Sequence, residues 1–355
     1  MERKASQEIN VRLIFSIHIM LSKYIRSISK SISLNRESKI YLPVYFFLSL
    51  VSLVLKLRLT AAWLDGTLAH NHQLLLAFQY TNNEQSRLLQ FLPPEFLRAV
   101  FSLSIETSYA LARFLFVFLA FVAFHYFLRK WFNPVESFAG VLILNGSMVV
   151  AFLIDDLQES APLLMLLFVL GLWAIREKKD WLFAVLLLIG GGLTNETMLV
   201  MPVGYFFYRL QSKKLADIFK TGARSGLLAL PAFLTQGLLR YITRNNPYLD
   251  TKFRLPDNLN RLWHELINPG TTLFHGTFIY PLLIFSVFWV FAILGYSKSP
   301  PFLRSVFWIV PFFIVGNLIT GIISESRQMI PLGFIIIPMA LFFMIPEARA
   351  RSFPD

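Results

Sequence analysis

The chain has 355 residues, of which 55% are hydrophobic and only 15% are charged, and its mean hydropathy is +0.57. These values exclude an ordinary soluble domain and indicate an all-α polytopic membrane protein. The absence of cysteine excludes disulfides, thiolate metal sites and thiol nucleophiles. The net charge of +12 does not indicate nucleic acid, because Lys and Arg lie mainly in short segments beside apolar runs, where membrane topology accounts for them.

The first segment, residues 1–39, is basic, and charged residues interrupt its apolar stretch. Between Val11 and Ile28 the apolar pattern is broken by Arg12, Lys23 and Arg26, and no small-residue cleavage site follows. A cleavable signal is therefore not expected. The pattern predicts a basic amphipathic helix that lies on the anionic cytoplasmic leaflet.

Residues 40–345 form a single predicted transmembrane domain, followed by a cytoplasmic tail over residues 346–355. The apolar runs bounded by charge are 40–55, 108–127, 135–154, 161–175, 181–208, 225–242, 277–296, 306–323 and 329–345. If the run at 181–208 is counted as two short helices, about ten transmembrane helices are expected.

The run from Trp181 to Tyr208 is too long for one crossing of about 20 residues and too short for two. Basic residues flank it on both sides, so we expect it to enter the bilayer, turn near Asn195 and Glu196, and return. The alternative, a single crossing, separates Lys and Arg less well across the membrane. The glycines at 190–192 could supply the break or allow close helix packing, and both interpretations stay open.

Two predicted outer loops exceed a simple turn. The first, about residues 60–107, has the pattern of two short amphipathic helices in the membrane interface, with Pro93 and Pro94 breaking it. The second, about residues 244–276, carries several prolines and Trp263. We expect the two loops to pack together over a cavity that opens to the outer leaflet.

Acidic residues are the first candidates for chemistry in this cavity. Asp65 follows the first span, although it could simply cap a turn before Gly66. Asp155 and Asp156 follow the third span, and adjacent carboxylates raise each other's proton affinity, which suits proton transfer or cation binding. A plain cluster at a helix end would have the same sequence.

Three further polar residues require partners or a function. Glu196 lies deepest, where an unpaired carboxylate would cost several kcal/mol, so we expect either a structural partner or a site. Glu325 and Arg327 lie in the last loop, where Arg327 could present its guanidinium to a phosphate or only form an exposed ion pair. His70 and His72 do not predict a metal site, because their rings point apart on a helix.

The whole arrangement resembles the GT-C type membrane glycosyltransferases, the polyprenyl-phosphate-sugar-dependent enzymes that include the protein mannosyltransferase superfamily. The resemblance rests on Asp65 after the first span, the long first loop, the acidic pair Asp155 and Asp156, the Thr-Asn-Glu-Thr-Met-Leu-Val-Met-Pro run at 194–202 and the late Glu325-Ser-Arg327. Members commonly carry Asp-Glu or Asp-Asp after the first span, where this chain has Asp65-Gly66.

The resemblance implies an inverting transfer of a sugar from a polyprenyl-phosphate donor to an acceptor glycan, lipid or protein on the outer face. It makes Asp65 the first candidate base and Asp155 or Asp156 the second, with Arg327 held by Glu325 against the phosphate and Glu196 on the sugar hydroxyls. No cofactor is required, although a divalent cation could assist. Besides substrates, only membrane lipids are expected as partners. The compact loops favour a bacterial inner membrane, and the distribution of Lys and Arg predicts that both termini are cytoplasmic.

Two other hypotheses stay open at this point. A broken hairpin with a deep carboxylate also occurs in ion-coupled carriers, so the chain could be a transporter or a flippase of a lipid-linked precursor. A non-catalytic subunit with the same fold is the third reading. The gathering of acidic residues on one face favours the glycosyltransferase.

Overall fold

The computed structural model describes residues 36–59, 65–80, 83–154, 158–243, 253–267, 279–322 and 325–350. All regular elements in these ranges are helical, as expected for an all-α membrane protein. The chain divides into two compact units, residues 1–44 and residues 45–355. In the described part of the first unit, the helix α2 (Arg36–Leu59) has begun, and it continues into the second unit.

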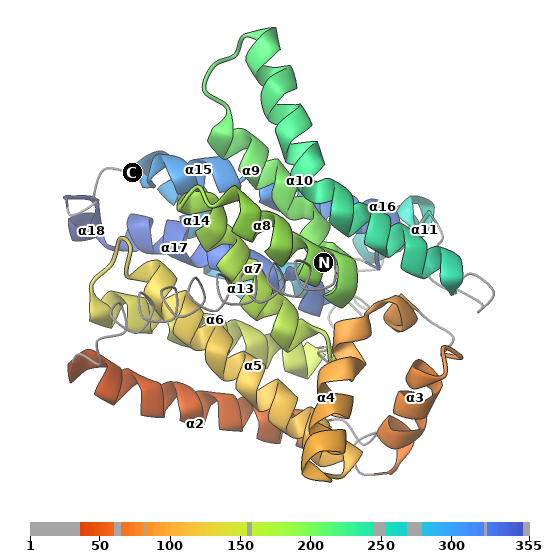
Figure 1. Cartoon of the computed structure of the whole chain (residues 1–355). Helices are drawn as coiled ribbons and strands as arrows, with labels where there is room; N and C mark the ends of the chain where they lie inside the picture. Colours follow the sequence, from red (N-terminus) through yellow and green to blue (C-terminus); the bar gives the residue numbers. More distant parts are fainter. Residues whose placement is uncertain are drawn as a thin grey trace, which may run out of the picture. The chain divides into compact units, whose positions relative to one another are not determined.

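The remaining helices belong to the second unit (Figure 1). The α-helices are α3 (Thr67–Leu76), α4 (Leu88–Phe101), α5 (Ile105–Leu128), α6 (Pro134–Ile154), α7 (Ala161–Arg176), α8 (Asp180–Leu187), α9 (Met201–Arg209), α10 (Leu215–Ile242), α11 (Leu255–Ile267), α13 (Ile279–Phe285), α14 (Val287–Gly295), α15 (Pro301–Val306), α16 (Ile309–Thr320), α17 (Gly333–Met344) and α18 (Pro346–Ala350). The 3-10 helices are η2 (Asn83–Ser86), η4 (Glu196–Val200), η5 (Tyr296–Lys298) and η6 (Ser326–Leu332), and η3 (Leu188–Thr194) is a π-helix.

Five helical segments among the described residues are long and apolar enough to cross a membrane. They are Lys39–Leu59, Ile105–Leu128, Pro134–Phe152, Pro301–Thr320 and Arg327–Met344, and three shorter apolar helices accompany them. These segments support an integral membrane protein. Of the other predicted crossings, 161–175 is shorter, 181–208 and 277–296 are interrupted, and 225–242 lies in the unbroken helix α10 but is not among these spans. The number of about ten therefore stays a prediction. The predicted crossing at 277–296, for example, is interrupted at Ser286, whose φ of 45° separates α13 from α14.

The core is formed by helices that are apolar on all sides. Every residue of α17 from Gly333 to Phe342 is buried, which is the pattern of a helix surrounded by others. It packs most closely against α14, where Gly295 meets the carbonyl of Met339 and leaves no room for a Cβ. The second large contact joins α5 and α7, which run side by side in Figure 1. Helices with one exposed apolar face, such as α10, surround this core.

The predicted reversal between residues 181 and 208 is present in the structure. Asp180 at the start of α8 accepts a hydrogen bond from Arg209 at the end of α9 at 2.6 Å and another from the Tyr205 hydroxyl at 3.0 Å. The rings of Phe183 and Tyr205 stack with their centroids 5.3 Å apart. The two limbs therefore lie together at their ends, and the chain turns back between them.

Both interpretations of the glycines at 190–192 hold. They lie in η3, a stretch of π-helix in which the hydrogen-bond register widens before the turn. They are also packed closely: a Cβ on Gly190 would overlap the Met198 sulfur, and one on Gly191 would lie 2.7 Å from Leu199 Cδ2. The break and the close packing thus act together to fold η4 back against η3.

The first predicted outer loop contains two short helices, α3 and α4, but the expected break at Pro93 and Pro94 is wrong. Both prolines lie inside α4, which continues to Phe101. Proline removes one hydrogen bond from a helix, yet here Phe91 and Pro94 are buried, Phe91 in a small core with Leu75. Burial of the apolar face of α4 therefore outweighs the lost hydrogen bonds.

Candidate active site

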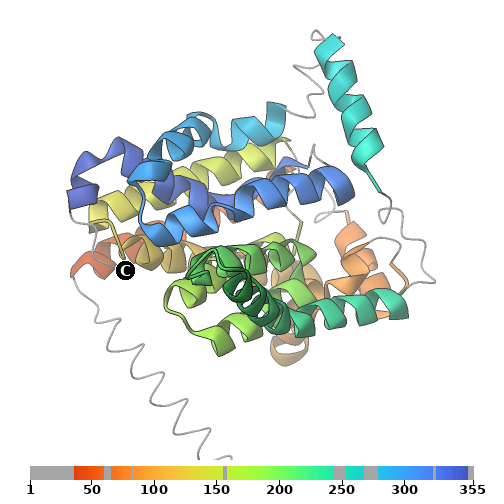
Figure 2. The ribbon, with the colours of Figure 1, turned by 90° about the horizontal axis from the view of Figure 1, so that it is seen from above.

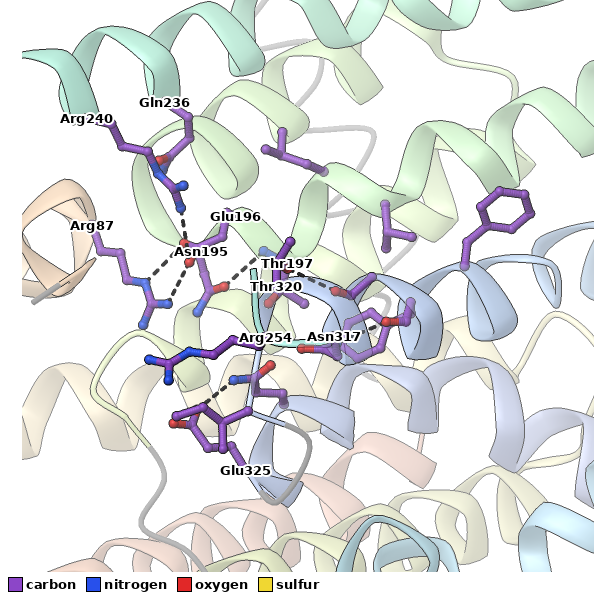
Figure 3. Close-up of a pocket in the computed structure, with 18 of the residues that line it drawn as sticks. Arg87, Asn195, Glu196, Thr197, Gln236, Arg240, Arg254, Asn317, Thr320 and Glu325 are labelled. Carbon is purple, nitrogen blue, oxygen red and sulfur yellow. Dashed lines mark hydrogen bonds and ion pairs between the residues drawn. The ribbon is translucent and has the colours of Figure 1, made fainter. Parts of the chain in front are cut away.

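A cavity of about 810 Å³ lies where the hairpin tip meets α10, α16 and the turn before η6 (Figure 3). Its charged residues are three arginines, Arg87, Arg240 and Arg254, and two glutamates, Glu196 and Glu325. The rest of the lining is Gln158, Asn195, Thr197, Leu199, Val200, Phe233, Gln236, Gly237, Phe253, Phe312, Phe313, Gly316, Asn317, Thr320, Gly321, Ile322 and Gln328. Positive charge exceeds negative charge among these side chains.

The hairpin tip is fixed by Asn195, which has extended backbone between η3 and η4. Its Oδ1 accepts a hydrogen bond from the backbone N–H of Thr197 at 3.0 Å, the usual contact of a residue that caps a helix start. Its Nδ2 donates to the Ser160 hydroxyl at 3.3 Å, which ties the tip to the start of α7. As a result, Glu196 emerges from a rigid turn.

Glu196 forms a two-pronged ion pair with Arg87, which lies between η2 and α4. Arg87 Nε donates to Oε2 at 3.2 Å and Nη2 donates to Oε1 at 3.0 Å. The remaining Nη1 donates to Gln158 Oε1. Arg87 is only 4% exposed; two of its nitrogens hold the hairpin tip against the first loop, and the third binds Gln158 before α7.

The helix α10 contributes a second arginine and a buried amide. Arg240 Nη2 lies 3.6 Å from Glu196 Oε1, and its side chain is 42% exposed. One turn earlier, Gln236 is 4% exposed and donates its Nε2 to the carbonyl of Gly192 at 3.1 Å. Gln236 lines the cavity, and its Oε1 is buried without a hydrogen-bond partner.

Arg254 reaches the cavity from the residues just before α11. Its backbone N–H donates to the carbonyl of Ile319 at 2.8 Å, which attaches this segment to the end of α16. Its Nη1 lies 3.7 Å from a carboxylate oxygen of Asp257. In Figure 3 its guanidinium lies between the Glu196 cluster and Glu325. The two sequence-distant halves of the chain thus each supply cations to one space.

Glu325 and Arg327 lie together at the opposite wall. Glu325 Oε2 accepts a hydrogen bond from Gln328 Nε2 at 2.6 Å and lies 3.2 Å from Arg327 Nη2. Glu325 lines the cavity, whereas Arg327 stands beside it and does not line it. The predicted pairing of these two residues is therefore present, with the carboxylate and not the guanidinium facing the cavity.

The rim of the cavity is apolar and exposed on one side. Phe233 of α10, Phe253 and Phe312 of α16 all line the cavity and are 51%, 62% and 51% exposed. Of the three, Phe312 belongs to a segment that is long and apolar enough to span a membrane. The cavity combines a charged interior with an apolar opening.

Asp65 does not line this cavity. Its exposed carboxylate accepts a hydrogen bond from the backbone N–H of Thr67 at 2.9 Å, at the start of α3. Hydrogen bonds from Thr67 lower the pKa of Asp65 below its ordinary value, which makes it a weaker base. The structure thus gives Asp65 the capping geometry that the sequence had offered as its alternative.

Asp155 and Asp156 lie outside the described residues. Gln158, two positions further along, lines the cavity and holds Arg87. The four predicted residues that the structure describes are therefore divided: Glu196, Glu325 and Arg327 lie at or beside one cavity, and Asp65 does not. Among the described residues, no group of three or more His, Asp and Glu side chains could hold a metal ion.

The sequence pointed to Glu196 but not to its partners. In the sequence, Arg87 is a charge of the first predicted outer loop, Arg240 lies near the end of an apolar run, and Arg254 is one cation of the second predicted outer loop. The sequence offers a hint for Arg240, because this charged residue lies near the end of an apolar run, in the last turn of α10. None was available for Arg87, because its contact with Glu196 joins residues 109 positions apart.

Residues 91–237 match the family model for dolichyl-phosphate-mannose-protein mannosyltransferases. The matched stretch runs from α4 to α10 and includes Glu196, Asn195 and Gln236. It confirms over these residues the resemblance to GT-C type membrane glycosyltransferases. No curated protein and no solved structure matches the chain.

Proposed function

We propose that this protein transfers a sugar from a polyprenyl-phosphate donor to an acceptor glycan, lipid or protein on the outer face of the membrane. The observation that carries the proposal is the cavity itself, in which three arginines and two glutamates meet behind a rim of exposed phenylalanines. A donor of this class needs both features, because its phosphate is anionic and its lipid tail is apolar. The family match over residues 91–237 supports the same reaction class.

In the proposed complex, Arg240 and Arg254 bind the phosphate. Arg87 is a poor candidate for this role, since Glu196 and Gln158 already occupy its nitrogens. A guanidinium matches phosphate oxygens with two parallel hydrogen bonds, and a partly dry site strengthens this contact. The polyprenyl tail would leave between Phe233 and Phe312.

The sugar would lie against Glu196 and Gln236. Glu196 is fixed by Arg87 before any ligand arrives, so its oxygens can accept hydrogen bonds from sugar hydroxyls without rearrangement. Gln236 Oε1 is a buried acceptor without a partner, and a hydroxyl donor would satisfy it. These two groups would select a hydroxyl-bearing ligand over an apolar one.

The transfer itself would be an inverting displacement. A carboxylate removes the proton of the acceptor hydroxyl, the acceptor oxygen attacks the anomeric carbon, and the bond from that carbon to the phosphate oxygen breaks with its electron pair on the phosphate. Negative charge grows on the leaving phosphate, where Arg240 and Arg254 stabilise it. We assign the base to Asp155 or Asp156, because they lie two or three residues from Gln158 at the cavity wall.

Glu325 and Arg327 would shape the acceptor side. Glu325 faces the cavity and is oriented by Gln328 and Arg327, so it can accept a hydrogen bond from an acceptor group. The distribution of basic residues supports a position of this side away from the cytoplasm, with both termini cytoplasmic, and the compact loops favour a bacterial inner membrane.

The experiment is a binding measurement by native mass spectrometry with undecaprenyl phosphate and dolichyl phosphate as probes. Wild-type protein should retain one of them. Arg240→Gln and Arg254→Gln should each lower its affinity about tenfold or more, the usual effect of losing a hydrogen bond to a charged group. Arg224→Gln is the matched control, because Arg224 pairs with Asp180 and does not line the cavity. Equal binding by wild type and both cavity variants would contradict the proposal.

A carrier would behave differently in a second measurement. Liposomes that contain the protein would move a lipid-linked sugar across the bilayer without releasing polyprenyl phosphate. If this movement is observed and is lost in Glu196→Gln, the protein is a flippase and not a glycosyltransferase.

A further inference from the structure

The helix α11 has an apolar face that no other helix of the described structure covers. Leu259, Trp263 and Ile267 recur at intervals of four residues and are 47%, 63% and 56% exposed. Residues four apart lie on the same side of an α-helix, so the three side chains form one stripe. Figure 2 shows α11 extending away from the other helices of its unit.

The opposite face of α11 is polar. Arg261 and His264 are exposed there, and Asp257 is 61% exposed. A helix that is sharply divided into a polar and an apolar face, with a tryptophan on the apolar one, is typical of helices that lie in the membrane interface. In a membrane protein, the apolar face of such a helix is expected to contact lipid and its polar face to contact water and headgroups.

The start of α11 is fixed at the end of a membrane span. Asn258 is 2% exposed, and its Nδ2 donates to the carbonyls of Leu318 at 2.8 Å and Gly321 at 3.0 Å. These carbonyls close α16, the second half of the candidate span Pro301–Thr320. A span ends where the hydrocarbon meets the headgroups, so Asn258 holds α11 at that depth.

From these observations we propose that α11 lies in the outer headgroup layer, with Leu259, Trp263 and Ile267 inserted into lipid and Arg261 and His264 facing water and headgroups. The partner of this surface is the bilayer that surrounds the protein. The consequence is that Arg254, one residue before α11 begins, is held at headgroup depth. This inference concerns the position of a helix and stands whether or not the cavity transfers sugars.

The test uses the absence of cysteine in the chain, which allows a single spin label at any position without other changes. Trp263→Cys carries the label on the apolar stripe, and Arg261→Cys carries it on the opposite face of the same helix. Each protein is reconstituted into liposomes of phosphatidylethanolamine and phosphatidylglycerol. Relaxation of the label by oxygen, which concentrates in hydrocarbon, is compared with relaxation by a water-soluble nickel chelate.

At position 263 the ratio of oxygen to nickel relaxation should be several-fold higher than at position 261. Equal ratios at the two positions would overturn the proposal. Strong dipolar broadening between labels at 263 on two copies would show that a second copy of the chain covers the stripe, and would overturn it as well. If Trp263→Cys does not fold, Leu259→Cys takes its place, because it lies on the same stripe.

Discussion

At the scale of single residues, the pair of Arg87 and Glu196 decides how the cavity is organised. Arg87 is almost fully buried, and a buried charge is tolerated only when it is paired and hydrogen-bonded. The pair joins the first loop to the hairpin tip, and Gln158 extends the contact toward α7. The ion pair therefore fixes the orientation in which the Glu196 carboxylate faces the cavity.

Breaking this pair should be costly. Arg87→Met leaves the Glu196 carboxylate without its main partner, and removal of one member of a buried pair typically costs about 3 to 5 kcal/mol. We expect a lower thermal unfolding temperature in detergent and loss of sugar transfer. Arg87→Met combined with Glu196→Met should recover most of the stability but none of the activity. Full activity in Arg87→Met would show that the pair does not position the site.

Substitutions of the candidate bases are expected to have different effects for Asp65 and for the pair Asp155 and Asp156. Asp156→Asn or Asp155→Asn should lower the rate of transfer by at least about a hundredfold, the usual contribution of a general base. Asp65→Asn should leave the rate within a few-fold, since Asp65 only accepts a hydrogen bond in the turn before α3 and does not line the cavity. The rates are compared in the same membrane vesicles at equal protein content. A strong loss in Asp65→Asn alone would restore the first candidate base.

Glu95 gives a pH-dependent contribution to stability outside the cavity. Hydrogen bonds from Arg98, and then from His72, lower the pKa of Glu95 from 4.5 to about 2. Because the folded-state pKa lies below the unfolded one, the contribution is present above pH 4.5 and is lost as the pH falls toward 2. Glu95→Gln should therefore reduce the difference in unfolding temperature between pH 5 and pH 3. An unchanged difference would contradict this assignment.

Single residues differ in how well the sequence predicts their contacts. Glu196 could be predicted to need a partner, because a deep carboxylate cannot stay unpaired. Arg87 could not be named as that partner, since nothing local brings residues so distant in sequence together. Asp65 was predicted at the site from its place after the first span, yet its carboxylate accepts a turn hydrogen bond from Thr67, only two residues away, and does not line the cavity.

At the scale of elements, the hairpin depends on the close contact between η3 and η4. The Met198 side chain fills the space that a Cβ on residue 190 would need. Only glycine at this position therefore allows the turn to close. The widened register of the π-helix ends the first limb at Thr194. Asn195 then starts the second limb, so one short run of sequence contains the break, the contact and the cap.

Gly190→Ala should open this turn. The added Cβ would overlap the Met198 sulfur, and overpacking of this kind costs about 1 to 3 kcal/mol. We expect a lower unfolding temperature and reduced transfer, both recovered in part by adding Met198→Ala. Gly226→Ala in α10 is the control, since a Cβ there meets nothing within 4 Å. If Gly190→Ala and Gly226→Ala behave alike, the contact does not hold the turn.

Elements were predicted best where apolar length alone defines them. The spans at α5 and α6 begin and end within a few residues of their predicted limits. The break at Pro93 and Pro94 was wrong because burial of α4 compensates for two missing N–H groups. The start of α10 was placed ten residues late, since Leu215 to Arg224 is helical but too polar to count as a span.

At the scale of the whole molecule, the cavity draws on segments from residue 87 to residue 328. The family match covers residues 91–237 and so includes the hairpin but not Arg87, Arg240 or Arg254. The reaction class could be expected from the sequence, since short motifs and loop lengths carry it. The set of arginines around the cavity could be seen only in the folded chain, because the hairpin, α10 and α16 converge only in three dimensions.

The most direct test of the proposed transfer measures the release of polyprenyl phosphate. Purified protein is added to membrane vesicles from cells that lack it, and lipid extracts are analysed over time by mass spectrometry. We predict that a polyprenyl-phosphate-linked sugar declines while free polyprenyl phosphate rises in equal amount with wild type, and that neither changes with Arg254→Gln combined with Arg240→Gln. Constant levels of both lipids with active, folded wild-type protein would contradict the proposed function.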